Sequence, residues 1–314
     1  MADMKASITY SQLRRYFWLA APLSFFVLGL GQLYVGRIRW AAYFLVAWVA
    51  VAALLLTSVP LTFAGFAFAY LGLFSVYAVA GVHAGIIAWR EPLIERRAYH
   101  RWYVYPTYAV IVPGAMMGVV YAVVGLGGYH PFRLASDAMA PTLRAGDYFV
   151  VKEELFDPRY VGEVVAYRRD DETHVHRLVA VAGDRVAVRG GRLIINGAEL
   201  AVRPLCRVPA FPDGRTVEVA EERLGNHRYA VQNLDEGSDF VREREEATLA
   251  PGQFFVMGDF RDNSMDSRML GAFDESQFVG RALYIIWSDD RSRIGRSLLT
   301  DLPVVGKDHC PGVP

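Results

Sequence analysis

Long apolar runs dominate the first 128 residues of the chain. Three of them, at residues 40–59, 61–89 and 103–126, contain about twenty residues or more without an acidic, lysine or arginine side chain. A helix rises about 1.5 Å per residue and must cross roughly 30 Å of hydrocarbon, so each run is long enough to span a bilayer. The alternative, buried core helices, fails because so many runs leave no polar face for a soluble fold. We therefore predict three transmembrane helices.

A fourth run, residues 16–35, is also long enough but is interrupted by four residues that break its pattern: Pro22, Gly29, Gly31 and Gln32. This run is either a full span with the N-terminus outside or, as Arg14 and Arg15 favour, a re-entrant hairpin with the N-terminus inside. A cleaved signal peptide is a poorer interpretation, because the apolar run continues past Ala20 and Ala21.

The basic residues predict the orientation of these segments. Arg37 and Arg39 follow the apolar run at 16–35, and the connection 90–101 carries four more arginines. The turn at 58–62 is uncharged. Arginine-rich connections remain in the cytoplasm, so the last span exits outward in both arrangements. The chain is thus expected to be a multi-pass protein of the cytoplasmic (inner) membrane, in contact with the lipid bilayer, with everything from about residue 128 outside the cytoplasm.

The charge balance separates the same two parts. Lysine plus arginine equals aspartate plus glutamate, 33 against 33, yet residues 1–128 carry nine basic and three acidic side chains. The first part is therefore +6 and the remainder −6. An acidic exported part would repel phosphates, which excludes an ordinary nucleic-acid binder.

The pattern of residues in the second part predicts short strands. They are rich in β-branched and aromatic residues, are bounded by Gly, Asp, Asn and Pro, and predict a mainly β domain at residues 148–151, 163–167, 174–181, 185–188, 192–195, 228–232, 253–257 and 279–287. We predict a membrane region at 1–127, an extracytoplasmic β domain at 128–300 and a tail at 301–314. The stretch 199–250 is charged and less regular, so it is interpreted as an insertion with a mostly solvated face; its glutamates are Glu218, Glu221, Glu222, Glu243, Glu245 and Glu246.

Cysteine and histidine give no sign of a metal or cofactor. Cys206 and Cys310 lie in the exported part with 103 residues between them, and are expected to be two unpaired thiols, although an oxidising compartment would permit a disulfide. His174 and His176 share one face of a strand but lack an obvious third zinc ligand. We expect no cofactor and no metal site.

Three segments carry the chemistry, in a fixed order after the membrane region. They read Ser-Asp-Ala-Met-Ala-Pro-Thr-Leu at 136–143, His-Val-His-Arg-Leu-Val-Ala-Val-Ala-Gly-Asp at 174–184, and Gly-Asp-Phe-Arg-Asp-Asn-Ser-Met-Asp-Ser-Arg at 258–268. Together they resemble the type I signal peptidases over roughly residues 130–290. That family has Ser-x-Ser-Met-x-Pro-Thr-Leu first, a Lys-Arg or His-Arg pair in the middle, and Gly-Asp-Asn-Arg-Asp-Asn-Ser-x-Asp-Ser-Arg last. The multi-span N-terminus lies outside the resemblance.

The resemblance implies a serine nucleophile at position 138, where this chain has alanine. A methyl group cannot attack a carbonyl, so the chain as written should form no acyl-enzyme by the family route. Ser136 is implied to contribute its hydroxyl to the oxyanion hole together with the backbone N–H of residue 138. Ser136 is a poor substitute nucleophile, because alternate residues of an extended segment lie roughly 6.5 to 7 Å apart.

The resemblance also implies a base at position 176. Bacterial members commonly have lysine there, but the only lysines are Lys5, Lys152 and Lys307, none near this motif. His176 suits the task, since imidazole titrates near neutral pH. Ser264 and Asp266 match the residues that orient or polarise the base, and Asp259 is a second candidate for the carboxylate that holds His176. The sequence leaves the choice between the two aspartates open.

Two hypotheses of different class follow. In the first, the chain is a membrane-bound serine endopeptidase of signal peptidase type in a Ser→Ala form, acting on the signal peptides of exported preproteins, with Met139 and Pro141 on the substrate-binding surface and the secretion machinery as a further partner. In the second, it is a non-catalytic homologue that binds signal-peptide-like segments or membrane partners. Ala138 is either an engineered inactivation or a natural loss, and the retained Ser136, His176, Ser264 and Asp266 favour a recent or deliberate change.

Overall fold

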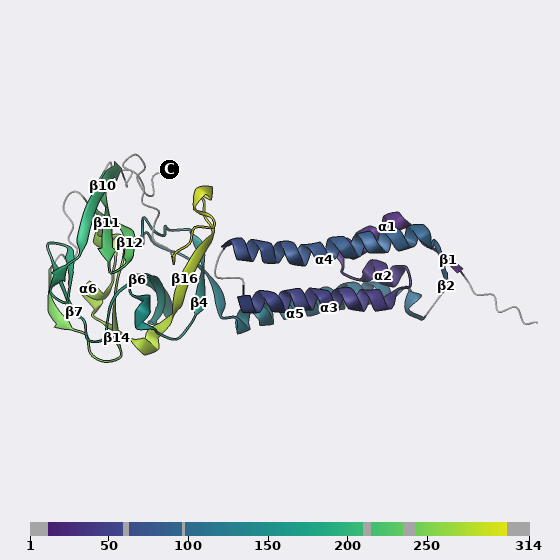
Figure 1. Ribbon diagram of the computed structural model, residues 1–314, viewed down its shortest axis with the longest axis horizontal. Coiled ribbons are helices and arrows are strands. Elements are labelled where there is room, and N and C mark those ends of the chain that lie inside the picture. Colours follow the sequence, from purple (N-terminus) through teal and green to yellow (C-terminus); the bar gives the residue numbers. More distant parts are fainter. Residues whose placement is uncertain (1–11, 59–62, 96–97, 210–214, 235–242, 300–314) are drawn as a thin grey trace, which may run out of the picture. The chain divides into compact units, whose positions relative to one another are not determined.

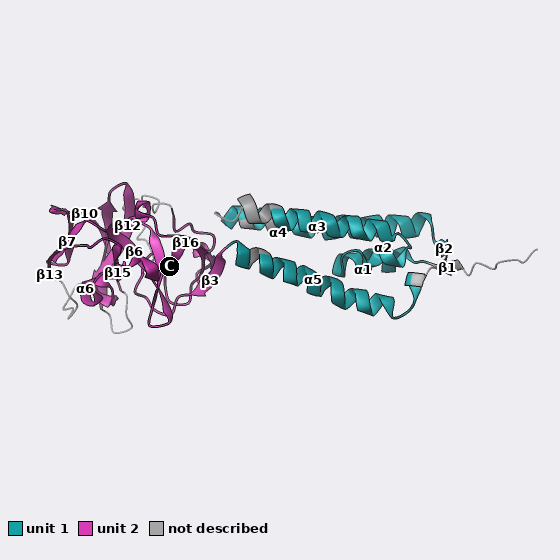
Figure 2. Ribbon diagram, turned by 90° about the horizontal axis from the view of Figure 1, so that it is seen from below, with its two compact units in different colours: residues 1–127 teal, residues 128–314 magenta. Residues whose placement is uncertain are grey.

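A computed structural model describes residues 12–58, 63–95, 98–209, 215–234 and 243–299. The chain divides into two compact units, Met1–Gly127 and Gly128–Pro314 (Figure 2). The first is helical and the second is built mainly of strands (Figure 1). Each unit is described by itself below.

In the described residues of the first unit there are five α-helices and one short strand pair. The helices are α1 (Phe17–Phe26), α2 (Leu30–Tyr34), α3 (Ile38–Ser58), α4 (Phe63–Arg90) and α5 (Val104–Leu126), with a 3-10 turn η1 (Ala98–His100) before α5. Strands β1 (Gln12–Arg14) and β2 (Leu93–Glu95) pair antiparallel. Two described helices are long and apolar enough to cross a membrane, Phe63–Arg90 and Val104–Ala122, while Phe17–Phe26 and the described part of α3, Ile38–Ala53, are shorter apolar helices.

The apolar run at 16–35 forms two short helices rather than one. The first ends at Phe26, and Gly29, which caps the start of the second, has φ +85°, a left-handed conformation that a side chain rarely adopts. Buried polar groups then fix the turn, since the Ser24 hydroxyl donates to Gln32 Oε1 at 2.5 Å and Gln32 Nε2 donates to the Ala80 carbonyl at 2.6 Å. The break removes a straight span through this run and ties it to α4.

The second unit is built from antiparallel strands in three sheets. The largest has seven strands in the order β15-β14-β6-β5-β16-β4-β3, namely Phe273–Asp274, Gln253–Met257, Glu172–Val181, Val164–Arg169, Phe278–Trp287, Tyr148–Glu153 and Tyr129–Arg133. A four-stranded sheet has the order β13-β7-β8-β9: Arg244–Thr248, Arg185–Arg189, Arg192–Ile195 and Ala198–Glu199. A three-stranded sheet contains β10 (Ala201–Pro209), β11 (Thr216–Leu224) and β12 (His227–Leu234). The loops between strands contain short helices: η2 (Pro158–Tyr160), η3 (Arg261–Asn263), α6 (Ser267–Leu270), η4 (Glu275–Gln277) and η5 (Arg291–Arg293).

The predicted mainly β fold is confirmed. Each of the eight predicted strands is present, with ends that agree within about two residues. Successive side chains of a strand point to opposite faces, and on β14 both faces are buried: Phe255 and Met257 lie in one core cluster, and Phe254 and Val256 lie in another.

The region 199–250 departs from its prediction. It contains the whole three-stranded sheet and β13, so it is more regular than its charge pattern indicated. Glu222 is not on a solvated face: it is 1% exposed and pairs with Arg261, whereas its neighbour Glu221 pairs with Arg203 at a partly exposed site. The sequence alone predicts that a charged strand residue is exposed to solvent, because it does not show a buried counter-ion that lies far away in the chain.

The prediction of unpaired thiols is wrong for Cys206, which is disulfide-bonded. The other cysteine of the sequence, Cys310, lies outside the described residues. The large separation along the chain argued against pairing, but a disulfide requires only that two Cα atoms come within about 7 Å in space. An oxidised cysteine agrees with a domain exposed to an oxidising compartment.

Candidate functional site

The segment that carries Ala138 is held against the last motif by the backbone. It leaves β3 as a turn in which the Ala140 N–H donates to the Asp137 carbonyl at 2.9 Å. The carbonyl of Ala138 accepts a hydrogen bond from the N–H of Phe260 at 3.0 Å. This bond connects residues of the first and third motifs, although more than a hundred positions separate them. It depends only on backbone atoms, so Phe260 in place of the family's Asn does not disturb it.

Gly258 brings residue 138 and Ser264 close together. A Cβ at this glycine would collide with the Oγ and Cβ of Ser264 and would lie 2.6 Å from the carbonyl oxygen of Ala138. No side chain fits between the two segments. Glycine at 258 is therefore required for their close approach, and a sequence motif that begins with glycine has a direct structural reason.

His176 joins this cluster from β6. Its Nε2 lies 3.1 Å from the Oγ of Ser264, and its Nδ1 lies 2.8 Å from the hydroxyl of Tyr167 on β5. The residues are almost fully enclosed, with exposed fractions of 4%, 1% and 0% for His176, Ser264 and Tyr167. The structure thus gathers the nucleophile position, the predicted base and Ser264 around Gly258. Ser136, by contrast, is exposed and makes no side-chain hydrogen bond with a described residue.

The two candidate aspartates have other partners. Asp259 forms a two-pronged pair with Arg177, Nε to Oδ1 at 2.8 Å and Nη2 to Oδ2 at 2.5 Å, and also accepts from the Thr142 hydroxyl. Asp266 pairs in the same way with Arg268 and accepts from the N–H of Gly258 at 2.8 Å. Within the described part of the chain neither carboxylate bonds to His176, so the expectation that one of them holds the ring is wrong. Asp259 instead holds the side chains of Arg177 and Thr142, and Asp266 holds the backbone at Gly258 and Arg268.

Burial decides the charge state of His176. Removal from water lowers the pKa of His176 to about 4, an effect that the nearby charge of Asp266 opposes but does not cancel. The same cause raises the pKa of the Tyr167 hydroxyl far above its usual range. At neutral pH the site therefore holds a neutral imidazole between two neutral hydroxyl groups.

A sequence profile described as "Signal peptidase, peptidase S26" matches residues 107–287. The chain belongs to this family. Among its relatives, signal peptidase I of Pseudomonas aeruginosa is 27% identical over 194 residues, covering 52% of this chain and 66% of the relative. Signal peptidase I of Pseudomonas fluorescens is 29% identical over 188 residues, covering 50% and 64%. The chain therefore matches slightly less than two thirds of the length of these two relatives.

One further relative and one solved structure also match the chain. Signal peptidase I S of Bacillus subtilis is 28% identical over 173 residues, covering 52% of this chain and 80% of the relative. A crystal structure of a signal peptidase I from Enterococcus faecalis V583 is 20% identical, covering 41% of this chain and 98% of that one, with a TM-score of 0.25. A TM-score of that size carries no weight for the fold.

In this signal peptidase family member, Tyr167 is the site residue that the sequence did not reveal. It faces His174 directly across the β5–β6 pair, and His176 is the diagonal neighbour, within reach of a large aromatic side chain. The Tyr167 ring also packs against Phe273 at 4.5 Å between centroids, which fixes its position in the core. A period-2 pattern shows that Tyr167 is a strand residue but gives no hint of its partner.

The region 199–250 of this family member braces the site. Arg261 donates to Glu222 through Nη1 at 2.7 Å and Nη2 at 2.5 Å, and the Tyr229 hydroxyl donates to the same carboxylate at 2.6 Å. The guanidinium of Arg177 stacks over the ring of Tyr229 at 3.9 Å. Two strands of the three-stranded sheet thus hold the residue that follows the base and the loop that contains Ser264.

Met139 and Pro141 do not line a surface. Met139 is 0% exposed and packs in a core cluster with Leu143 and Phe149, and Pro141 is buried as well. The expectation that these two side chains contact substrate is therefore wrong for the structure as it stands. The resemblance suggested a surface, but residues 139–143 are all buried.

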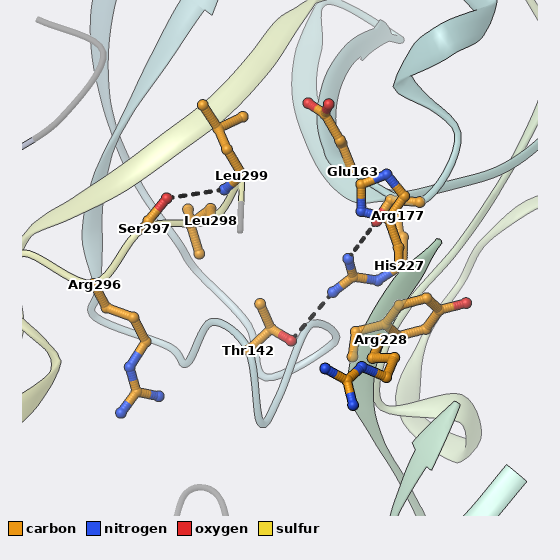
Figure 3. Close-up of a pocket in the computed structure, with 11 residues that line it drawn as sticks. Thr142, Glu163, Arg177, His227, Arg228, Arg296, Ser297, Leu298 and Leu299 are labelled. Carbon is orange, nitrogen blue, oxygen red and sulfur yellow. Dashed lines mark hydrogen bonds between the residues drawn. The ribbon is translucent and has the colours of Figure 1, made fainter. Parts of the chain in front are cut away.

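A pocket in the β unit is lined by residues that support this cluster and not by the cluster itself. Thr142, Arg177, His227, Arg228 and Arg296 are among its lining residues, and Ala138, His176 and Ser264 are not (Figure 3). Within it, Nη2 of Arg177 donates to the Thr142 hydroxyl at 3.3 Å. No group of three or more His, Cys, Asp or Glu side chains in the described residues is arranged to hold a metal ion.

Proposed function

We propose that this protein binds the signal peptides of exported preproteins at the outer face of the cytoplasmic membrane, at a serine endopeptidase site of signal peptidase I type whose nucleophile position is occupied by Ala138. The observation that carries the proposal is the convergence of residue 138, His176 and Ser264 around Gly258. A bound peptide carbonyl would lie beside residue 138, where the N–H of Ala138 makes no hydrogen bond with a described residue. That N–H is suited to receive an oxyanion.

The absence of a hydroxyl at 138 means that the chain as written does not cleave through an acyl-enzyme. Ser264 does not replace it, because its Oγ is enclosed between His176 and Gly258 and is out of reach of an extended peptide. Binding, however, needs only a strand edge and the oxyanion donors, and these do not depend on the missing oxygen.

The membrane part of the proposal rests on the apolar helices and on the arginines. Two described helices have the length and composition of membrane spans, and the buried Ser24 and Gln32 are satisfied by partners inside the helical unit. Arginine-rich connections on the cytoplasmic side would place the β unit outside. The lipid bilayer is then a partner of the chain, and the secretion machinery that delivers preproteins is a further one.

The deciding experiment restores the nucleophile. The full chain with Ala138→Ser is placed in liposomes and assayed with a preprotein that has Ala-x-Ala before its cleavage site. Cleavage at least about 100-fold above that of the unchanged chain is expected, because loss of the nucleophile costs a serine protease several orders of magnitude. Ala135→Ser, which adds a hydroxyl to an exposed neighbour outside the motif, is the matched control and should give no cleavage.

A second substitution tests the base. On the Ala138→Ser background, His176→Ala is expected to return activity to the level of the unchanged chain. Undiminished turnover would show that the base is misassigned. No cleavage by a folded Ala138→Ser chain in lipid would sink the endopeptidase proposal.

The second candidate is a natural non-catalytic homologue that binds signal-peptide-like segments. One observation favours it: His176 is hydrogen-bonded by a tyrosine, where a catalytic histidine is usually held by a carboxylate. Signal-peptide binding by the unchanged chain, together with no cleavage after Ala138→Ser, would support this candidate over the first.

A further inference from the structure

Arg15 is a buried cation of the helical unit without a counter-ion among the described residues. It lies between β1 and α1, is 9% exposed, and its backbone N–H donates to the Pro92 carbonyl at 2.6 Å. Its guanidinium forms no ion pair with a described residue, and its Nε is enclosed without a hydrogen-bond partner there. Removing a charge from water is costly unless an opposite charge compensates it. Arg15 is therefore suited to an anion that comes from outside the chain.

The buried arginines of the β unit show the usual arrangement. Each of them forms an ion pair with a buried carboxylate: Arg177 with Asp259, Arg261 with Glu222, Arg268 with Asp266 and Arg293 with Asp147. Arg15 is the exception among the buried arginines that the structure describes. The difference is one of charge and not of burial.

The groups that contact the Arg15 guanidinium are aromatic and neutral. Its Cζ lies 4.2 Å from the centroid of the Tyr34 ring, and its Nη2 donates to the Tyr105 hydroxyl at 3.4 Å, which is long for such a bond. Both contacts orient the guanidinium, but neither partner carries a net charge. Nε is its one enclosed nitrogen without a partner, so Nη1, which bonds to no described residue, reaches the surface.

Backbone donors follow Arg15 directly in the chain. Helix α1 begins at Phe17, and the N–H groups of Phe17 and Trp18 make no hydrogen bond with a described residue. The first N–H groups of a helix, together with its dipole, favour a negative charge. One short segment thus presents a guanidinium edge and the first turn of a helix.

This end of the helical unit has the composition of a membrane interface. It is the end where β1 pairs with β2 (Figure 1), where α3 and α5 begin and where α4 ends. Exposed tryptophans and tyrosines lie at these helix ends: Tyr16, Trp18, Trp40, Trp89, Trp102 and Tyr103. Tryptophan and tyrosine are enriched at the level of the lipid headgroups. The site of Arg15 is therefore at headgroup depth if the helices span a bilayer.

The same end has an excess of positive charge. Exposed arginines lie at the start of α3, at the end of α4 and before α5: Arg37, Arg39, Arg90 and Arg101. Glu91 is the one acidic side chain that the structure describes in this unit, and it is engaged by Arg37 at 2.6 Å. Basic groups at a cytoplasmic membrane face attract anionic lipids.

We propose that Arg15 and the first turn of α1 form a binding site for the phosphate of an anionic phospholipid headgroup in the cytoplasmic leaflet. The terminal nitrogens of a guanidinium can donate together to two phosphate oxygens, and a further oxygen remains for the helix N–H groups. A net anionic headgroup supplies the charge that Arg15 lacks, whereas a zwitterionic headgroup carries a cation of its own. This inference rests on the membrane part of the proposed function and concerns a segment outside the matched residues 107–287.

Competition between two lipids tests the site on the full chain in detergent. Phosphatidylglycerol and phosphatidylcholine with the same acyl chains are added in equal amounts, and native mass spectrometry measures how much of each stays bound. Phosphatidylglycerol should be favoured at least about fivefold. Arg15→Gln should abolish this preference. Arg39→Gln removes the same charge from an exposed residue at the same end and is the matched control, which should keep most of it.

Two further arms examine the geometry and the source of the phosphate. Arg15→Lys keeps the charge but not the planar fork, so it should retain only part of the preference. An excess of inorganic phosphate should not displace bound phosphatidylglycerol, because the site lies at the level of the headgroups. Displacement by phosphate would assign the site to a soluble phosphate and overturn the lipid.

The outcomes separate this inference from the proposed function. Equal binding of the two lipids to the unchanged chain overturns the site and needs no variant, so it does not depend on whether Arg15→Gln folds. Equal losses in Arg15→Gln and Arg39→Gln would indicate general electrostatic attraction and also overturn it. A chain that fails to float with liposomes overturns the membrane part of the proposed function, whereas signal-peptide binding is measured separately.

Discussion

The Nε2 atom of His176 lies 3.1 Å from Oγ of Ser264, although 88 positions separate the two residues. The contact joins β6 of the large sheet to the loop after η3, and Gly258 leaves no side chain between Ser264 and the Ala138 carbonyl. The histidine that we propose as the base and a serine hydroxyl are therefore at hydrogen-bonding distance. This relationship is what makes the site testable by substitution.

Tyr167→Phe should accelerate the enzyme that Ala138→Ser creates. The buried Tyr167 hydroxyl has Nδ1 of His176 as its one hydrogen-bond partner among the described residues, so it donates to Nδ1 and keeps that nitrogen unprotonated. A base that accepts at Nε2 needs the other tautomer, and a buried unsatisfied donor costs about 1–3 kcal/mol, so without the hydroxyl kcat should rise about tenfold above that of Ala138→Ser alone. Steady-state cleavage of a preprotein measures it. Tyr284→Phe, a buried tyrosine on β16, is the control. A fall in kcat for Tyr167→Phe would show that the tyrosine serves only to hold the histidine in place.

His176 should make the β unit less stable in acid. Burial lowers its pKa to about 4 from an ordinary value of 6.5, so between these limits the unfolded chain binds a proton that the folded chain does not. The contribution is fully present above pH 6.5 and is lost as the pH falls to about 4, roughly 3 kcal/mol in total. Urea midpoints at pH 7.5 and pH 4.5 should differ less for His176→Gln than for the unchanged chain. Equal acid sensitivity of the two proteins would argue that this histidine is not the cause.

Glu222→Gln should destabilise the β unit far more than Glu221→Gln, its neighbour on β11. Glu222 and Arg261 are 1% and 4% exposed in their side chains, so the change leaves a buried guanidinium without its counter-ion, at a cost of about 3–5 kcal/mol. Glu221 pairs with an Arg203 side chain that is 53% exposed, and such pairs contribute about 1 kcal/mol or less. Urea unfolding followed by circular dichroism compares them. Similar losses would mean that the buried pair does not brace the site.

The cysteines should be inaccessible to alkylation until the protein is reduced. Cys206 is disulfide-bonded, and the sequence contains two cysteines in all. Iodoacetamide under denaturing, non-reducing conditions should therefore leave the mass of the protein unchanged, and after reduction it should add two labels. Mass spectrometry reads the result directly. Two labels without reduction would place the β unit in a reducing compartment or show that the bond does not form.

Much of this site was predictable because motifs are local. The strand at 192–195, the turn glycines and the order of the three motifs follow from residue type and spacing, and so does the identity of residue 138. The partners of the charged residues were not predictable. Asp259 and Asp266 were equivalent candidates for holding His176, yet each forms an ion pair with an arginine. Glu222 resembled a surface residue because its counter-ion, Arg261, lies 39 positions away in the sequence.

The sequence by itself determined that a mainly β domain with the signal peptidase motifs follows a series of apolar segments, and that the alanine at position 138 cannot act as a nucleophile. These properties depend on side-chain chemistry and on periodicities that each short segment carries alone. Only the tertiary structure decided that Tyr167, rather than an aspartate, meets His176. That contact is set by the register of β5 against β6 and by the packing of the ring on Phe273, and both arise from many distant contacts at once.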